Sequence, residues 1–136
     1  MQVKGILETA LYADDLFRSA EFYRRLFGFD TLLESDRLIA LNVAGRSVLL
    51  LFQKGATSEP AVVPGGVIPP HGGSGVLHMA FSIAAEDVEP WKARLQSEGV
   101  AIESEVNWPH GGQSLYFRDP DNHVIELMSP GFWTIY

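Results

Sequence analysis

Apolar and polar residues alternate along eight short stretches of this chain and recur at helical spacing in two longer ones. Helical spacing predicts one helix from about residue 15 to 27 and another from about residue 86 to 98. Alternation predicts strands at residues 6–13, 29–35, 37–43, 47–53, 76–83, 100–106, 114–120 and 123–128. Each half of the chain therefore has the order strand, helix and three strands.

The ends of both predicted helices carry suitable residues. Asp14 and Asp15 offer N-cap oxygens to the first helix, and Gly28 suits a left-handed C-cap. Glu86 suits the first turn of the second helix, which Gly99 ends. Each helix has an apolar stripe that predicts packing against a sheet, formed by Leu16, Ala20, Tyr23 and Phe27 in the first and by Val88, Trp91 and Leu95 in the second.

The halves are separated by a stretch rich in glycine and proline. Gln53 to Gly75 holds six of the 13 glycines and four of the eight prolines, which helices and central strands tolerate poorly. We therefore expect a first module at 1–53, a linker or flap at 54–75, and a second module with an aromatic tail at 76–136. Together they are expected to form one compact domain.

The repeated pattern predicts an α+β fold of two tandem βαβββ modules. When the halves are overlaid, Glu8 falls on His78 and Leu50 falls on Glu126. We expect the modules to form a curved, cup-shaped mixed sheet with the helices on its convex side. Glu8, His78 and Glu126 would then converge on the concave side.

These three residues are polar groups in otherwise apolar strands. An unpaired charge is costly to desolvate, so Glu126 in particular needs a partner. One prediction is a divalent metal bound by Glu8, His78 and Glu126. The alternative is a network of salt bridges and hydrogen bonds among the same side chains.

Composition narrows the classes of partner. The 136 residues carry a formal charge of -7 without a cluster of Lys or Arg, which argues against nucleic acid and anionic membranes. No apolar run approaches the roughly 20 residues of a membrane span, and the N-terminus lacks a signal-peptide pattern, so a cytoplasmic location is expected. The chain has no cysteine, so His, carboxylate, amide or water must hold any metal.

Three motifs, DLFRSAEFYRRLFGF, HMAFSI and DPDNHVIELM, resemble the vicinal oxygen chelate superfamily of glyoxalases, bleomycin-resistance proteins, fosfomycin-resistance transferases and extradiol dioxygenases. The resemblance covers nearly the whole chain. It implies metal-ligand positions at Glu8, Leu50, His78 and Glu126. Two positions depart from the pattern: Glu8 stands where His or Gln is common, and Leu50 stands where glyoxalases have a fourth ligand. The resemblance thus implies a three-ligand site and a homodimer.

Two carboxylates and one imidazole leave about three positions open on an octahedral ion. Hard oxygen donors favour Mn, Fe(II) or Mg, and Zn or Ni is also an expected occupant. Glu8 or Glu126 is the predicted general base. Tyr116 lies ten residues before Glu126, where the similar branches have a tyrosine that contacts substrate or supplies a proton.

Several other residues have two interpretations. Arg118 shares the face of Tyr116 and either binds substrate or pairs with a nearby aspartate, and Tyr12 either lines the pocket or joins the core. Trp108 either forms a substrate wall or, like the aromatic tail, is a packing or dimer-contact residue. Gln53 is a weak candidate for a fourth ligand. Among the other histidines, His123 is expected to be solvated, and His71 and His110 to lie on the surface or in a lid.

Two functions follow from these observations. The first is a metal-dependent enzyme of the lyase, isomerase or dioxygenase type, acting on a small molecule that chelates the metal through adjacent oxygens. The second is a metal-free protein that binds a drug or metabolite, as in the bleomycin-resistance branch. In both cases the partners are a small molecule and a second copy of the chain.

Overall fold

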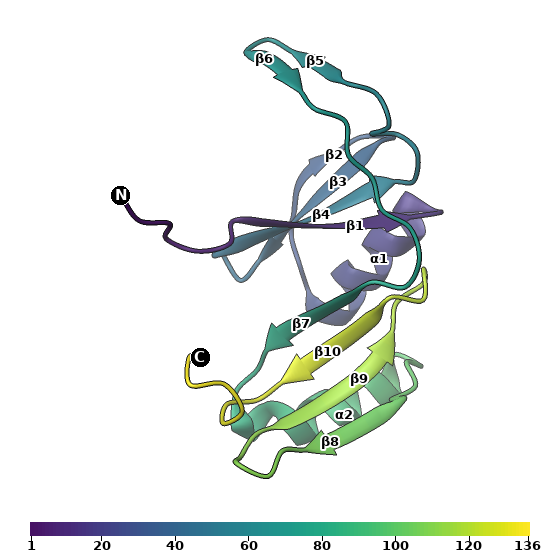
Figure 1. The fold of residues 1–136 in the computed structure, drawn as a ribbon. Helices are drawn as coiled ribbons and strands as arrows, with labels where there is room; N and C mark the ends of the chain where they lie inside the picture. Colours follow the sequence, from purple (N-terminus) through teal and green to yellow (C-terminus); the bar gives the residue numbers. More distant parts are fainter. The chain divides into compact units, whose positions relative to one another are not determined.

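The computed structural model describes residues 1–136, which divide into two compact units, Met1–Gly75 and Val76–Tyr136. Each unit contains one long helix and a four-stranded sheet. Figure 1 labels these elements along the chain. This is the mixed α+β architecture that the repeated pattern predicts. No helix has the length and hydrophobicity that a membrane-spanning helix requires.

The sheet of the first unit has the strand order β1-β4-β3-β2. β1 and β4 are parallel, and the remaining neighbours are antiparallel. The strands are β1 (Glu8–Ala13), β2 (Thr31–Glu34), β3 (Leu38–Val43) and β4 (Ser47–Gln53). The first strand was predicted at residues 6–13, so the prediction begins two residues before β1.

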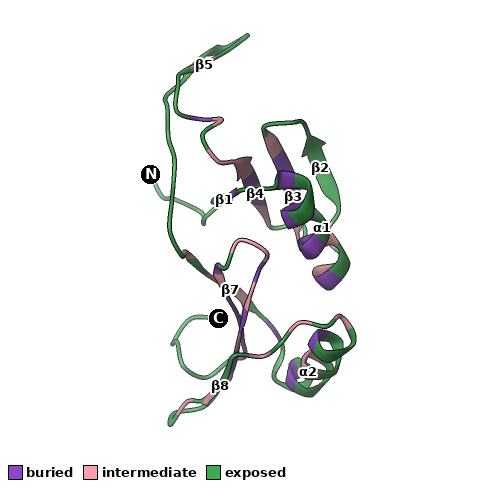
Figure 2. Cartoon of the chain, turned by 90° about the vertical axis from the view of Figure 1, so that its right-hand side faces the viewer, coloured by how far each residue is buried: buried purple, intermediate pink, exposed green.

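Helix α1 (Leu16–Phe27) packs on β3 and β4 of this sheet. Asp15 is its N-cap and accepts a hydrogen bond from the Arg18 amide at 3.0 Å. Gly28 ends the helix at φ 71°, a left-handed conformation that glycine adopts without steric penalty. The buried faces of the helix and sheet meet in a core, drawn purple in Figure 2, that contains Leu16, Tyr23, Leu26, Ile39, Leu41, Leu49 and Leu51.

The stretch expected to be a linker or flap contains a two-stranded hairpin. β5 (Ala61–Val63) and β6 (Gly66–Ile68) pair antiparallel, and the hairpin belongs to the first unit. Pro64 and Gly65 form the turn. Proline and glycine interrupt a central strand, but here they connect two short strands. We call residues 54–75 the arm.

The second unit repeats the first. Its sheet has the order β7-β10-β9-β8, with β7 parallel to β10 and antiparallel pairs elsewhere. A 3-10 turn, η1 (Ala85–Asp87), leads into helix α2 (Val88–Ser97). The strands are β7 (His78–Ser82), β8 (Ser104–Asn107), β9 (Gln113–Arg118) and β10 (Val124–Met128). The core of this unit contains Val88, Leu95, Leu115, Phe117, Ile125 and Leu127.

The strand registers confirm the predicted overlay of the halves. In the first unit Ala10, two residues after Glu8, pairs with Leu50. In the second unit Ala80, two residues after His78, pairs with Glu126. Leu50 and Glu126 therefore occupy the same position in the two copies of the repeat.

Candidate functional site

The second unit brings His78 and Glu126 together. His78 is the first residue of β7, and Glu126 lies in the middle of the neighbouring strand β10. His78 Nε2 and Glu126 Oε2 are 3.3 Å apart. The Glu126 side chain is only 7% exposed, whereas that of His78 is 53% exposed, so the pair can be reached from solvent through the imidazole.

The other imidazole nitrogen fixes the ring. His78 Nδ1 lies 3.1 Å from the carbonyl oxygen of Val124, which can only accept a hydrogen bond, so Nδ1 carries the proton. In a neutral His78 the Nε2 lone pair then faces the carboxylate. A proton or a metal cation between Nε2 and the carboxylate relieves that repulsion. A backbone carbonyl behind a histidine is also a common second contact in metal sites.

Tyr116 lies directly opposite Glu126 on β9. Burial raises the pKa of the Tyr116 phenol, and a hydrogen bond to the Glu126 carboxylate raises it further. The Tyr116 and His78 ring centroids are 6.3 Å apart. A protonated phenol, a carboxylate and an imidazole thus share one face of this sheet.

The donor chemistry of this cluster fits a divalent ion. At metal bonds of about 2.1 Å, two ligands at right angles lie about 3.0 Å apart, close to the observed separation of 3.3 Å. Two donors are too few for a metal site, however. Within either unit, no three His, Asp or Glu side chains lie together in a way that could hold an ion.

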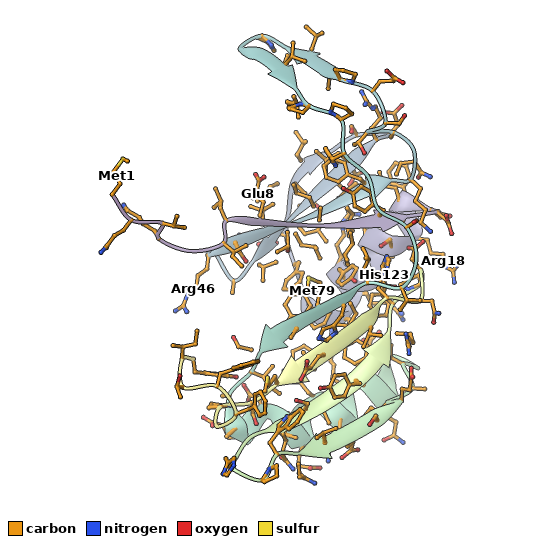
Figure 3. The ribbon with its side chains drawn as sticks, in the orientation of Figure 1. Met1, Glu8, Arg18, Arg46, Met79 and His123 are labelled. Carbon is orange, nitrogen blue, oxygen red and sulfur yellow. The ribbon has the colours of Figure 1, made fainter.

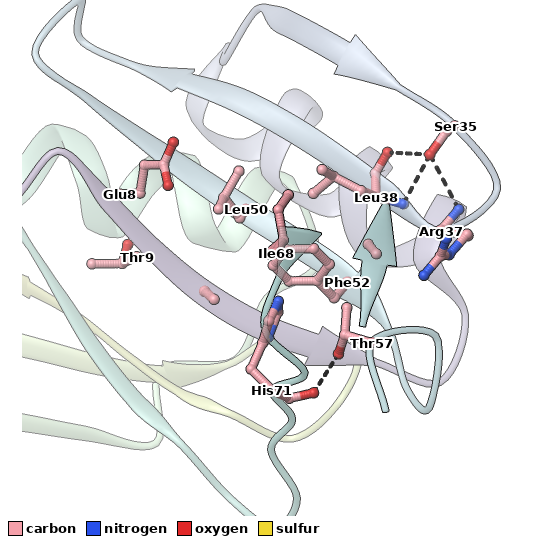
Figure 4. Close-up of a pocket in the computed structure, with 12 residues that line it drawn as sticks. Glu8, Thr9, Ser35, Arg37, Leu38, Leu50, Phe52, Thr57, Ile68 and His71 are labelled. Atoms are coloured by element: carbon pink, nitrogen blue, oxygen red, sulfur yellow. Dashed lines mark hydrogen bonds between the residues drawn. The ribbon is translucent and has the colours of Figure 1, made fainter. Parts of the chain in front are cut away.

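The third predicted ligand, Glu8, lies in the first unit at the start of β1, where Figure 3 labels it. It is exposed and lines a pocket of about 580 Å3 (Figure 4). Most of this pocket is apolar. The lining residues are Glu8, Thr9, Ala10, Ser35, Arg37, Leu38, Leu50, Phe52, Thr57, Ala61, Ile68 and His71.

Most of the polar groups in this pocket already have partners. Ser35 Oγ donates to the Leu38 carbonyl oxygen and accepts from the Leu38 amide, both at 3.1 Å. The Arg37 guanidinium donates to the Ala56 carbonyl oxygen. Thr57 Oγ1 donates to the His71 carbonyl oxygen at 2.6 Å. These groups therefore hold the pocket wall together.

Arg118 is engaged in a different pair from the predicted one. Its Nε and Nη2 donate to the two carboxylate oxygens of Glu103 at 2.5 and 2.7 Å, and Nη1 donates to the Asn122 carbonyl oxygen at 3.2 Å. The guanidinium lowers the pKa of the Glu103 carboxyl. The expected partner was an aspartate near the turn, whereas the observed partner is Glu103, just before β8.

Two aromatic residues occupy supporting positions. Tyr12 is buried, stacks on Phe52 and hydrogen-bonds to His71 Nδ1 at 2.7 Å, so it lies behind the pocket wall. Trp108 donates from Nε1 to Ser114 Oγ at 2.8 Å and lies against Phe132 of the tail, with ring centroids 4.4 Å apart.

The prediction that His123 is solvated is wrong. Only 1% of His123 is exposed, and its Nδ1 accepts a hydrogen bond from the Leu77 amide at 3.1 Å. Its own amide donates to Asp119 Oδ1 at 2.8 Å. The turn-forming residues around His123 predicted an exposed side chain. The ring instead lies beneath the turn and holds Leu77, the residue before His78.

Gln53 has a structural role in the first unit. Its Nε2 donates to the Asp14 carbonyl oxygen at 2.8 Å, and its Oε1 accepts from the Leu16 amide at 3.3 Å. Both side-chain atoms thus fix the start of α1. His110 is exposed, whereas His71 joins the pocket wall.

Sequence reasoning did not identify the pocket residues of the arm. His71 was expected on the surface or in a lid, but Thr57, Ala61 and Ile68, which also line the pocket, were not singled out. A signal was present, because the apolar pairs on either side of the Pro-Gly-Gly stretch in AVVPGGVI are typical of a hairpin.

Comparison with known proteins decides the family. A model of the Glyoxalase/Bleomycin resistance protein/Dioxygenase superfamily matches residues 5–127. The chain belongs to this superfamily. Two similar superfamily proteins are the glutathione transferase FosA of Serratia marcescens, which is 43% identical over 128 residues, and the metallothiol transferase FosB of Staphylococcus haemolyticus, which is 30% identical over 126. Each alignment covers 92% of this chain, with 80% of FosA and 83% of FosB.

A solved superfamily structure is also similar. The lactoylglutathione lyase from Agrobacterium tumefaciens superposes with a TM-score of 0.90 at 34% sequence identity. The match covers 99% of this chain and 100% of the lyase chain. The superfamily fold expected from the sequence motifs is therefore confirmed.

Proposed function

We propose that this superfamily member is a divalent-metal-dependent enzyme acting on a small molecule that binds the metal through adjacent oxygens. The observation that carries the proposal is the 3.3 Å approach of His78 Nε2 to Glu126 Oε2, with His78 Nδ1 committed to the Val124 carbonyl oxygen. A buried carboxylate facing an imidazole lone pair is a natural half of a metal site. Glu8 is the proposed third ligand.

Each group in the site has a proposed role. When bound, the ion polarises a substrate oxygen and stabilises negative charge that develops there. The phenol of Tyr116 is protonated at neutral pH, since its pKa lies above the ordinary value of 10.0, so its hydroxyl can donate a hydrogen bond or a proton to a substrate oxygen. Glu8 or Glu126 is the carboxylate base for a proton next to a substrate carbonyl.

The names of the similar proteins support a narrower reaction class. FosA is named a glutathione transferase, FosB a metallothiol transferase, and the similar structure a lactoylglutathione lyase. All three names refer to a thiol or a thiol adduct. We therefore propose a lyase, isomerase or transferase reaction with a thiol-containing substrate, in preference to a dioxygenase reaction.

Elemental analysis of the purified protein tests the metal site. We expect about one divalent ion per chain in the unmodified protein and at least a tenfold loss of metal affinity in Glu126→Gln and in His78→Gln. His110→Gln is the matched control, since it removes another exposed histidine outside the site. An unmodified protein that binds none of Mn, Fe(II), Mg, Zn or Ni would favour the metal-free binding protein, whose ligand the apolar pocket would hold.

We also propose a homodimer, and co-expression tests whether two chains share a site. Glu8→Gln and Glu126→Gln chains are co-expressed with different tags, and the mixed dimer is purified. If Glu8 and Glu126 of one site come from one chain, every site lacks a ligand and metal is lost. If they come from two chains, one of the two sites is complete, and about half of the metal remains.

A further inference from the structure

The pocket of the first unit is suited to a larger and less polar molecule than a metal-chelating group alone requires. Its volume of about 580 Å3 lies within the range of roughly 300–1,000 Å3 that is typical of sites for drug-sized ligands. Leu38, Leu50 and Phe52 of the sheet line it, and Ala61 and Ile68 of the arm line it as well (Figure 4). Glu8, the proposed third metal ligand, also lines it.

The arm presents one side of its hairpin to this pocket. Ala61 and Ile68 are paired across β5 and β6, and both line the pocket. Val62 and Val67 form the next pair, lie outside the lining and are 84% and 62% exposed. The hairpin therefore has two distinguishable sides, and a substitution on one side has a natural control on the other.

Several contacts anchor the arm where it returns to the sheet. The His71 amide donates to the Thr57 carbonyl oxygen at 2.9 Å, and Thr57 Oγ1 donates back to the His71 carbonyl oxygen at 2.6 Å. These two hydrogen bonds close the base of the arm. Figure 4 shows the side chain of His71 next to Phe52 and Ile68, at the wall of the pocket.

The His71 ring is held in one orientation. It meets Phe52 edge-on with ring centroids 4.7 Å apart, and its Nδ1 shares a hydrogen bond with the Tyr12 hydroxyl at 2.7 Å. Its Nε2 has no protein partner in the structure. A fixed ring with one uncommitted nitrogen therefore lies beside the apolar residues Phe52 and Ile68 of the pocket. A polar group in such a place fixes the orientation of a ligand and adds specificity.

We infer that this pocket binds a predominantly apolar, ring-bearing molecule with one hydrogen-bonding group, and that His71 Nε2 contacts that group. The edge-on rings of His71 and Phe52 favour an aromatic ligand surface, because aromatic groups pack well against such pairs. The inference rests on the proposed function, since Glu8 is both a pocket residue and the proposed metal ligand. It adds a specificity residue and a class of substrate.

Binding of 1-naphthol and naphthalene to the full chain tests this inference. The two probes have the same ring system, but only 1-naphthol has a hydroxyl group. We expect saturable binding of both, seen as a change in probe fluorescence. His71→Phe keeps an aromatic ring and removes the nitrogen, so 1-naphthol should bind about three- to tenfold more weakly while naphthalene changes less than twofold.

The two sides of the hairpin supply the second comparison. Ile68→Asp should weaken both probes more than tenfold, whereas Val62→Asp should change them less than twofold, with circular dichroism checking that both variants fold. Equal effects of these two substitutions, equal effects of His71→Phe on both probes, or no binding to the unmodified protein would overturn the inference. The titrations are repeated in EDTA, where probe binding should persist. Metal content alone tests the proposed metal site, so the two failures are distinguishable.

Discussion

Gly73 lies directly against the ring of Tyr12. A Cβ atom at position 73 would come within 2.5 Å of Tyr12 Cδ2, which is closer than real Cβ atoms approach. Tyr12 cannot readily move, because it is buried, stacks on Phe52 and hydrogen-bonds to His71. Glycine at this position therefore allows the arm to pass over β1.

Replacing Gly73 with alanine should destabilise the protein by about 1–3 kcal/mol through overpacking. It should also weaken 1-naphthol binding, because a shift of the Tyr12 ring would disturb its hydrogen bond to His71. Urea denaturation and the fluorescence titration measure the two effects. Gly72→Ala is the matched control, because a Cβ there has nothing within 4 Å, and its stability should stay within about 0.5 kcal/mol. Equal losses in both variants would contradict the contact as the cause.

His123 should stabilise the start of β7 through its hydrogen bond with Leu77. His123→Leu leaves the Leu77 amide without its side-chain acceptor and should cost about 1–3 kcal/mol in unfolding free energy. His123→Asn restores an acceptor at a similar position and should lose less. Because Leu77 precedes His78, His123→Leu should also weaken metal affinity, measured by competition with a chelator. A variant as stable and metal-loaded as the unmodified protein would rule out this positioning role.

Hydrogen bonds of the Tyr136 hydroxyl hold the end of the chain against the second sheet. Its hydroxyl lies 3.0 Å from the Ile83 amide, which donates to it, and 2.5 Å from the carbonyl oxygens of Ile83 and Met128. Tyr136→Phe should reduce the unfolding free energy by about 0.5–1.5 kcal/mol at pH 7. Chemical denaturation followed by tryptophan fluorescence measures the loss.

The same residue should make stability depend on alkaline pH. Burial raises the pKa of Tyr136 above its ordinary value of 10.0. A phenol with a raised folded pKa contributes fully below its unfolded pKa and loses that contribution as the pH rises through the folded value. Stability should therefore fall above about pH 10, and the fall should be shallower in Tyr136→Phe. Part of the pH dependence of stability should remain in that variant, because the pKa of Tyr116 is also raised. An unchanged slope would argue against Tyr136 as a source.

The turn between β3 and β4 offers a stabilising substitution. Ala44 and Gly45 have φ of 53° and 66°, so both central residues adopt the left-handed conformation of a type I′ turn. Alanine is strained there and asparagine tolerates it, so Ala44→Asn should raise the unfolding free energy by about 0.5–1 kcal/mol. Gly45→Ala should lower it by about 1 kcal/mol. Thermal denaturation of both variants checks the opposite signs.

The regular elements of this fold were predictable because their signals are local. Alternating residues gave the strands, Gly28 marked the end of α1, and the repeat identified His78 and Glu126 as residues near the same strand pair. A carboxylate inside an apolar strand needed a partner, and the structure places the His78 imidazole beside it. The convergence of Glu8 with these two residues stays a prediction.

The unpredicted features depend on contacts between distant parts of the chain. The burial of His123 depends on Leu77, 46 residues away, and the partner of Arg118 is Glu103, 15 residues away. Neither pair follows a helical or strand period. The hairpin within the arm was not predicted for a different reason, because the weight given to glycine and proline outweighed its short apolar pairs.

The shared backbone position of Leu50 and Glu126 shows how duplicated halves can divide labour. In the second unit this position carries a buried acid beside His78, whereas in the first it carries an aliphatic wall of the pocket. The same backbone position thus carries a carboxylate in one half and an apolar side chain in the other. A substitution at this one repeat position therefore acts on the buried carboxylate beside His78 in the second unit and on the shape of the apolar wall in the first.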